Sequence, residues 1–138
     1  MFKQSKPLTP KRIKKPKLPR PLPVIVRSCL IILENLAKKR SDERGYSIYF
    51  LNKDDYLVFE DVGQGLLTTS EFMYRDYIDP ETLKYLVSPT AIYLMHTHPF
   101  QDKPTPSALD IGTAERFRDH YNCPVYCCVV GRTGRWWY

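Results

Sequence analysis

The stretch that decides the fold lies at residues 91–110, which read AIYLMHTHPFQDKPTPSALD. Its first five residues, Ala91–Met95, are apolar and predict a short buried strand. Three prolines between residues 99 and 106 then exclude a helix and stiffen the connection. Ser107 is a favoured residue for the N-cap of a helix, and helical sequence follows it. The stretch therefore predicts a strand, a stiff loop and a helix that returns toward the end of the strand.

Upstream of this stretch, the residues from Ser28 to about Arg40 predict an amphipathic helix. Apolar residues recur there at intervals of three and four, and Ser28 suits the N-cap position. The last turn carries cations, which suit the negative end of a helix dipole.

Two β-prone runs follow, Tyr46–Leu51 and Tyr56–Phe59. The polar residues between them, 52–55, are typical of a turn, so we expect a β-hairpin. A third short strand is expected around Leu66–Thr69. A short helix is expected from Asp79 to about Leu86, because it opens with Asp-Pro-Glu.

The chain beyond residue 107 completes the domain. Ile111, Ala114 and Phe117 fall on one face of the helix that begins at Ser107, and Pro124–Val130 predicts a final buried strand. The expected order of elements is α-β-β-β-α-β-α-β. Such mixing predicts an α+β domain or a three-layer α/β domain.

The chain has 138 residues, of which 43% are hydrophobic, and both values suit one domain with a modest core. No stretch approaches the roughly 18 consecutive apolar residues that a membrane span requires. The basic N-terminus has no apolar segment followed by a small-residue cleavage site, so it does not resemble a secretory signal. We expect a soluble, cytoplasmic protein without a membrane partner.

The positive charge of the chain is concentrated at its N-terminus. Residues 1–22 carry eight Lys or Arg, no acid and five prolines, whereas residues 23–138 carry 13 basic and 15 acidic side chains. Proline at this density prevents helices and strand pairing, so we expect a disordered basic tail at 1–22 and the folded domain at 23–138. Such a tail can bind nucleic acid, an anionic surface or a proline-reading partner protein, or serve only as a solubilising leader.

Four cysteines raise the question of disulfides or of a zinc knuckle. Cys127 and Cys128 are adjacent and share an apolar segment with Cys123, while Cys29 lies in the predicted first helix. This arrangement favours reduced, mostly buried thiols, and the spacing does not match a zinc knuckle. We assign no chemistry to the cysteines.

His96 and His98 directly follow the strand Ala91–Met95. Residues two apart in an extended chain point to the same side, so the two imidazoles can approach a common point. If the loop brings the helix start back over the strand end, Asp110 supplies a third metal ligand. Two neutral imidazoles and one carboxylate leave a fourth tetrahedral position open, which is typical of catalytic zinc. Zinc lowers the pKa of a water in that position toward about 7 and can polarise a substrate carbonyl.

From Glu43 to about Val130 the chain resembles the JAMM metallopeptidases, also called MPN-plus or JAB proteins, whose pattern is an upstream Glu followed by H-x-H-x7-S-x2-D. The RadC-like branch is especially similar, because its loop commonly reads H-x-H-P-x-G-D-P-T-P-S-x-x-D and residues 96–110 read HTHPFQDKPTPSALD. The resemblance implies a three-layer α/β/α domain of the cytidine-deaminase-like JAB/MPN type, with a mixed central sheet flanked by helices. It also implies Zn²⁺ as the cofactor.

The family Glu begins the first core strand and acts on the attacking water. Glu43 stands in the expected region, but it fits only with a shift of one residue, because Arg44 occupies the matching position. Glu43 is therefore the first candidate for this role, and Glu60 and Glu71 remain alternatives.

The resemblance implies catalytic roles for Glu43 and Ser107. Glu43 would accept a proton from the attacking water and return it to the leaving amine, and the Ser107 hydroxyl would donate to the oxyanion. Eight residues separate His98 from Ser107 where the family pattern has seven. A one-residue insertion in the loop, for example at Lys103, would absorb this difference.

The function that the resemblance implies is a zinc-dependent metallopeptidase or isopeptidase. Its substrate would be a protein, such as a conjugate of a ubiquitin-like modifier or the C-terminus of that modifier. Two other functions stay open. RadC-like proteins have long carried a DNA-repair label, and with the tail 1–22 the chain also fits a nucleic-acid-associated factor. The fold serves elsewhere as an inactive scaffold in large assemblies.

Several of these residues also have purely structural interpretations. Ser107 and Asp110 form a near capping box, in which Ser107 caps the helix and Asp110 suits its positive end. The joint occurrence with the two histidines is what favours a metal site. His120 is expected to be a surface or helix-capping histidine, and the aromatic segment 135–138 to pack on the core.

Overall fold

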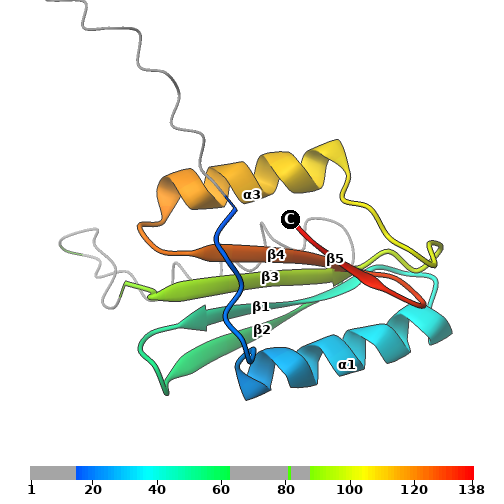
Figure 1. Cartoon of the computed structure of the whole chain (residues 1–138), viewed down its shortest axis with the longest axis horizontal. Helices are drawn as coiled ribbons and strands as arrows, with labels where there is room; N and C mark the ends of the chain where they lie inside the picture. Colours follow the sequence, from blue (N-terminus) through cyan, green and yellow to red (C-terminus); the bar gives the residue numbers. More distant parts are fainter. Residues whose placement is uncertain (1–14, 63–80, 82–87) are drawn as a thin grey trace, which may run out of the picture.

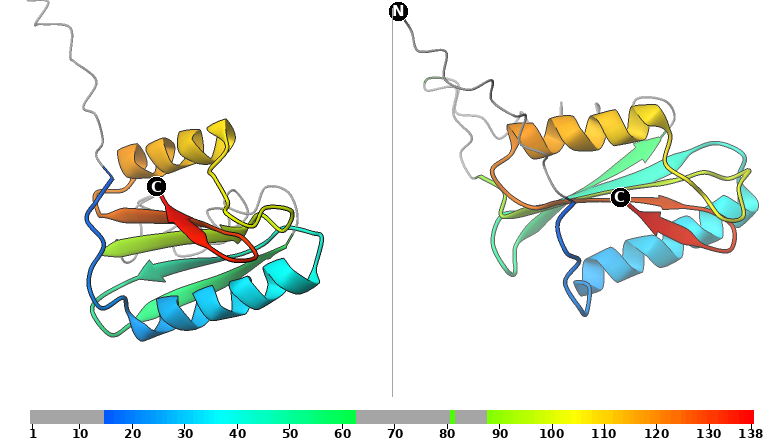
Figure 2. Two further views of the ribbon diagram at one scale, coloured as in Figure 1. Left: turned by 45° about the vertical axis from the view of Figure 1, so that its right-hand side comes forward. Right: turned by 45° about the horizontal axis from the view of Figure 1, so that its top comes forward.

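The computed structural model describes residues 15–62, 81 and 88–138 of the chain. In this part of the chain, two helices lie on opposite sides of a five-stranded sheet (Figure 1, Figure 2). The strand expected at residues 66–69 falls outside the described residues, as does the helix expected at residues 79–86, apart from Glu81.

The sheet is mixed. Its strands are β1 (Arg44–Phe50), β2 (Tyr56–Val62), β3 (Ala91–Thr97), β4 (Val125–Val130) and β5 (Arg135–Trp137). Their spatial order is β2-β1-β3-β4-β5. β3 and β4 are parallel, and the other neighbouring pairs are antiparallel. Because β3 and β4 are parallel neighbours, the chain must cross over a face of the sheet between them.

The predicted hairpin is confirmed in β1 and β2, which pair over seven residues each. The side chain of Asn52 accepts hydrogen bonds from the backbone N–H groups of Asp54 and Asp55, each at 2.8 Å. An Asn side chain that bonds the backbone two residues ahead stabilises a tight turn. The turn predicted at residues 52–55 therefore joins the two strands of the hairpin.

The first helix, α1, spans Val24–Lys39 and begins before the predicted start. Pro23 occupies the N-cap position, and Ser28 lies inside the helix, so the prediction that Ser28 caps it was wrong. Proline is tolerated at a helix start, where the backbone N–H has no helical partner. The extra turn is stabilised by Val26, which is fully buried against the sheet.

The second described helix, α3, spans Ala108–His120 and connects β3 to β4. Ser107 is its N-cap, as predicted. Helical spacing puts Ile111 on the same face as Ala114 and Phe117, but Ile111 is 44% exposed. The buried residues of α3 are Thr113, Ala114 and Phe117.

Each face of the sheet carries its own apolar core, because alternate side chains of a strand point to opposite faces. The core beneath α1 includes Ile48, Tyr93, Met95, Cys128 and Val130. The core beneath α3 includes Tyr49, Ile92, Leu94, Val125 and Cys127. The α+β class and the mixed sheet flanked by helices are thereby confirmed.

The four cysteines are free, as expected, and Cys127 and Cys128 are buried on opposite faces. Burial raises the pKa of both thiols to about 12, which makes them poor nucleophiles. They act as core residues.

Residues 15–22 lie against the domain. Lys15 Nζ donates to the carbonyl oxygen of Trp137 at 2.9 Å, and Pro16 and Leu18 line a small apolar space with the same Trp. The Trp137 side chain packs on the core, whereas Trp136 is exposed. Of the predicted tail 1–22, residues 1–14 lie outside the described part. Among the described residues, no helix combines the length and hydrophobicity that crossing a membrane would require.

Candidate metal centre

The parallel strands β3 and β4 position the two histidines. Ile92 and Leu94 of β3 face α3, and the alternation of the strand carries His96 and His98 to that same face. The backbone N–H of His98 still donates to Val130 O at 2.8 Å, so β4 holds the chain beyond the last residue of β3. Both histidines are buried, at 4% and 8% exposure. The rings therefore have little freedom to turn away from each other.

The first turn of α3 positions the carboxylate of Asp110. Ser107 N donates to Asp110 Oδ2 at 2.9 Å, and Asp110 N donates to Ser107 Oγ at 3.1 Å, which completes a capping box. The same carboxylate faces the histidines: Oδ1 lies 3.2 Å from His96 Nε2, and Oδ2 lies 3.3 Å from His98 Nε2. The side chain that caps the helix is thus the one that faces the two histidines.

The loop between β3 and α3 is held by the turn that joins β4 to β5. Arg132 N donates to Gln101 O at 3.0 Å, and Arg132 Nε donates to Pro99 O at 2.7 Å. Thr133 N donates to Asp102 O at 3.2 Å. These bonds fix the path that brings Asp110 back over the end of β3, in addition to the stiffness that the prolines supply.

The three groups meet at the spacing that a metal ion requires. His96 Nε2 and His98 Nε2 lie 3.1 Å apart, and all three ligand atoms lie within 4.8 Å of one another. A tetrahedral ion bound at about 2.0–2.1 Å keeps its ligand atoms about 3.4 Å apart. If each ring carries its proton on Nδ1, three electron-rich atoms face one another, and a cation between them stabilises that arrangement. The group can therefore hold a metal ion.

The electrostatics of the group favour an ionised carboxylate. Burial alone would raise the pKa of Asp110, but hydrogen bonds from His96 and His98 outweigh it and hold that pKa well below its usual value. The hydrogen bond to Asp110 raises the pKa of His98 against the opposing effect of burial, and the charge of Glu43 adds to the increase. Protons and a metal ion would compete for the same imidazole lone pairs.

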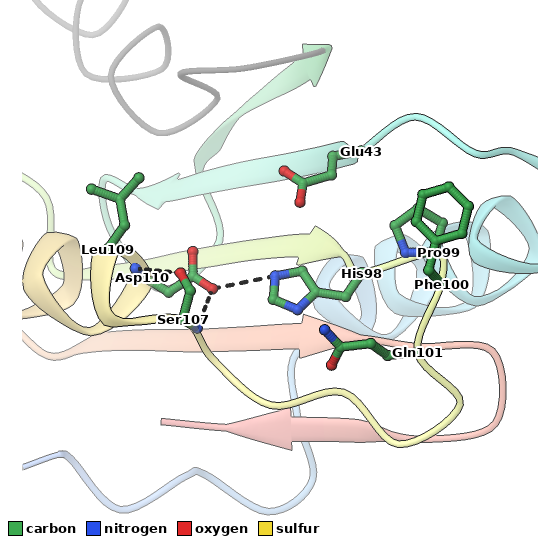
Figure 3. Close-up of a pocket in the computed structure, with 8 residues that line it drawn as sticks. All are labelled: Glu43, His98, Pro99, Phe100, Gln101, Ser107, Leu109 and Asp110. Atoms are coloured by element: carbon green, nitrogen blue, oxygen red, sulfur yellow. Dashed lines mark hydrogen bonds and ion pairs between the residues drawn. The ribbon is translucent and has the colours of Figure 1, made fainter.

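A cavity of about 340 Å³ opens beside these ligands. Figure 3 shows the residues that line it, which are Glu43, His98, Pro99, Phe100, Gln101, Ser107, Leu109 and Asp110. A concave site with a few convergent polar groups is the usual form of a substrate pocket. The candidate metal centre thus borders a cavity of that form.

Glu43 lies just before β1 and contributes its carboxylate to this cavity. The neighbouring Arg44 turns instead to Asp42, with Nε 2.9 Å from Oδ2, although Arg44 occupied the matching position in the family pattern. Glu60, on β2, is not among the described residues that line the cavity, and Glu71 lies outside the described residues. Of the two candidate acids within the described residues, Glu43 lines the cavity and Glu60 does not.

Ser107 also lines the cavity. Its Oγ accepts the hydrogen bond from Asp110 N, and a hydroxyl that accepts keeps its own hydrogen to donate. His120, on the far end of α3, is exposed and stacks edge-on against Tyr121, consistent with the surface role expected for it.

Three cavity residues were not singled out by the sequence analysis: Phe100, Gln101 and Leu109. An apolar residue in a loop or at a helix start is common on any protein surface, so the sequence could not distinguish Phe100 and Leu109 from ordinary exposed residues. Gln101 stands where the RadC-like loop has Gly, and that departure was the one available hint.

The arrangement could hold a metal ion through two imidazoles and a carboxylate, and the Glu43 carboxylate and the Ser107 hydroxyl line the cavity beside it. Comparison of the chain with models of known protein families, with curated proteins and with solved structures finds no match.

Proposed function

We propose that the chain is a zinc-dependent peptidase or isopeptidase of the JAMM type, related to the RadC-like branch. The observation that carries the proposal is the meeting of His96, His98 and Asp110 at ligand spacing, with Glu43 and Ser107 in the adjoining cavity. The resemblance of residues 96–110 to the family loop supports it, and so does the α+β domain with its mixed sheet.

Zinc fits this ligand set because imidazole and carboxylate are common zinc ligands, and three protein ligands leave one position for water and substrate. A zinc ion there would supply a water of lowered pKa and would polarise the carbonyl to be attacked. The three donors among the described residues therefore match a catalytic ion better than a structural one, which would have four protein ligands.

The chain's own residues would move the protons. Hydrolysis breaks the C–N bond of the substrate, adds OH to the carbonyl carbon and adds H to the amine nitrogen. Glu43 would accept the proton of the attacking water and give it to the leaving amine. The Ser107 hydroxyl would donate to the oxygen that gains negative charge.

The charge of the cavity favours a peptide substrate over a phosphodiester. Its described lining contains two carboxylates, Glu43 and Asp110, and no Lys or Arg. Phosphate recognition relies on Arg, Lys or helix N-termini. The start of α3 lies at this cavity, but its capping position is already taken by the Asp110 carboxylate, which accepts from Ser107 N at 2.9 Å. An amide carbonyl is neutral and needs no such cationic partner.

The test combines metal analysis with cleavage. Purified protein is expected to contain about one zinc per chain by mass spectrometry of the metal, and to cleave fusions that end in ubiquitin-like C-terminal tails. Chelator abolishes cleavage and zinc restores it. Glu43→Gln keeps the side-chain shape, so it should retain zinc and lose turnover by about 10²–10⁴-fold.

Glu60→Gln is the matched control, because Glu60 is an exposed acid outside the described cavity lining. Equal activity of wild type and Glu43→Gln would remove Glu43 from the mechanism. Zinc-free protein that still cleaves would overturn the proposal as a whole.

The basic segment 1–22 favours a second function, association with nucleic acid, because its sequence contains eight Lys or Arg and no Asp or Glu. DNA binding through this segment should weaken steeply between low and physiological salt and disappear when residues 1–22 are deleted. Hydrolysis should survive the deletion. Zinc binding without hydrolysis of any peptide or isopeptide would instead identify an inactive scaffold.

A further inference from the structure

Two large apolar side chains stand exposed at the cavity. Phe100 is 74% exposed and Leu109 is 77% exposed, and both line the same cavity as His98 and Asp110. Figure 3 shows them on either side of these two residues. Exposed apolar residues that border a polar site commonly mark where a ligand packs.

Gln101 contributes an oriented hydrogen-bond donor to the same cavity. Its backbone N donates to His98 O at 3.1 Å, its backbone O accepts from Arg132 N at 3.0 Å, and its side-chain Oε1 accepts from Thr105 N at 3.0 Å. The remaining polar group is the Nε2 amide, and no group in the described part of the chain accepts from it. A donor fixed in this way does not need to be ordered when a substrate binds.

These features match the repeating chemistry of a polypeptide. An extended peptide presents carbonyl oxygens along its backbone and side chains that alternate in direction. Phe100 and Leu109 offer apolar contacts, and Gln101 offers a donor for a carbonyl. Since the described lining has no Lys or Arg, an acidic side chain of the peptide would gain no ion pair with a protein side chain there and would meet the carboxylate of Glu43.

We propose that the cavity selects an extended polypeptide with apolar side chains on both sides of the bond to be cleaved. One side chain packs on Phe100, the other packs on Leu109, and Gln101 Nε2 donates to a backbone carbonyl oxygen of the peptide. This inference rests on the proposed hydrolase function and specifies its substrate class.

The first test digests a random peptide library with the zinc-loaded protein and locates the cleaved bonds by mass spectrometry. Leu, Ile, Val, Met and Phe are expected to be enriched on both sides of those bonds. Phe100→Ser and Leu109→Ser should each remove the enrichment on one side and lower kcat/KM for the preferred peptide about tenfold. Both residues are exposed, so circular dichroism should show an unchanged fold.

Ile111→Ser is the matched control. Ile111 is an apolar residue of the same helix as Leu109, is 44% exposed and is not among the described residues of the cavity lining. Its replacement should leave the sequence preference and kcat/KM unchanged. An equal loss in Ile111→Ser would attribute the effect to general surface hydrophobicity and overturn the inference.

The second test isolates Gln101. Gln101→Glu keeps an oxygen for Thr105 N but replaces the amide donor by a carboxylate, so KM for the preferred peptide should rise about tenfold or more while zinc content stays the same. A readout without turnover is the fluorescence anisotropy of that peptide on zinc-loaded Glu43→Gln. Adding Gln101→Glu to this variant should weaken the measured affinity by a similar factor.

The outcomes separate the two levels of the proposal. Cleavage without apolar preference, or with a preference that Phe100, Leu109 and Gln101 variants do not alter, overturns the substrate assignment and leaves the hydrolase function standing. Zinc-loaded protein that cleaves neither the library nor the modifier fusions overturns both.

Discussion

Ser107 and Asp110 hold each other in place at the start of α3. Ser107 N donates to Asp110 Oδ2 at 2.9 Å, and Asp110 N donates to Ser107 Oγ at 3.1 Å. The same carboxylate lies 3.2 Å from His96 Nε2 and 3.3 Å from His98 Nε2. The helix cap and the candidate metal centre therefore share one carboxylate, and suitable substitutions can separate the two roles.

Ser107→Ala removes the hydroxyl and keeps the backbone N–H that holds Asp110. We expect zinc to remain bound, turnover to fall about 10²–10³-fold through loss of an oxyanion donor, and the free energy of unfolding to fall by about 1 kcal/mol through loss of the cap. Steady-state kinetics, zinc content and urea titration measure the three effects. Ser107→Thr keeps a hydroxyl and should retain most of the activity. Equal activity of Ser107→Ala and the wild-type protein would contradict the role of Ser107 as a hydrogen-bond donor.

Asp110→Asn separates charge from capping. The Asn carbonyl oxygen can still accept from Ser107 N, so the chelator-treated protein should lose little stability, whereas zinc affinity should fall by more than the ten- to hundredfold that an outer-sphere substitution costs. Asp110→Ala should lose the same zinc affinity as Asp110→Asn, and its free energy of unfolding should be about 1 kcal/mol lower than that of Asp110→Asn. Competition with a coloured zinc chelator and thermal melts in chelator measure the pair. Undiminished zinc binding in both would contradict the ligand assignment.

The strand, loop and helix of residues 91–110 could be predicted because their signals are local. Strand alternation sets the common direction of His96 and His98, and the Ser-x-x-Asp start of α3 is written in four neighbouring residues. The early start of α1 could not be predicted in this way. It depends on the packing of Val26 against the sheet. That is a tertiary contact, and the proline-rich sequence before the helix gives no local signal for it.

Other parts of the site depend on register and on three-dimensional proximity. Glu43 and Arg44 differ by one position, and a shift of one residue at a strand exchanges the two faces of the sheet, so sequence alone could not choose between them. The structure turns Arg44 to Asp42 and leaves Glu43 at the cavity. Helical spacing puts Ile111 on the face of Ala114 and Phe117, but Ile111 is 44% exposed, and the residue buried together with those two is Thr113.

We expect Asp61 to make the stability of the protein depend on pH. Its side chain is 1% exposed, Oδ2 accepts from Ser47 Oγ at 2.9 Å, and no group in the described part of the chain donates to Oδ1. Burial raises the pKa of Asp61 to about 7, and the bond from Ser47 opposes this only in part. Between its unfolded pKa of about 4 and about pH 7, the folded state holds a proton that the unfolded state has released, so stability falls as pH rises through that window.

Asp61→Asn should flatten this slope, which is at most about 1.4 kcal/mol per pH unit for one proton. Ser47→Ala removes the bond that stabilises the ionised carboxylate, so it should extend the fall in stability to higher pH. Urea titrations in chelator across this pH range measure both variants. A slope in Asp61→Asn as steep as in wild type would assign the pH dependence to other groups.

Gly131 leaves no room for a side chain, and Gly131→Ala tests whether the loop of residues 99–106 must dock to form the candidate metal centre. A Cβ there would lie 2.5 Å from Gln101 O and 2.7 Å from Asp102 O, so the loop backbone would have to move. We expect a loss of about 1–3 kcal/mol of stability, as for other overpacked sites, together with weaker zinc binding, because the loop connects His98 to Asp110. Gly112→Ala is the control: nothing lies within 4 Å of its Cβ, and Ala in a helix should stabilise the protein by about 0.5–1 kcal/mol without changing zinc affinity. Thermal melts and zinc titration of both variants decide the matter, and a Gly131→Ala protein that binds zinc like wild type would show that the ligands converge without the docked loop.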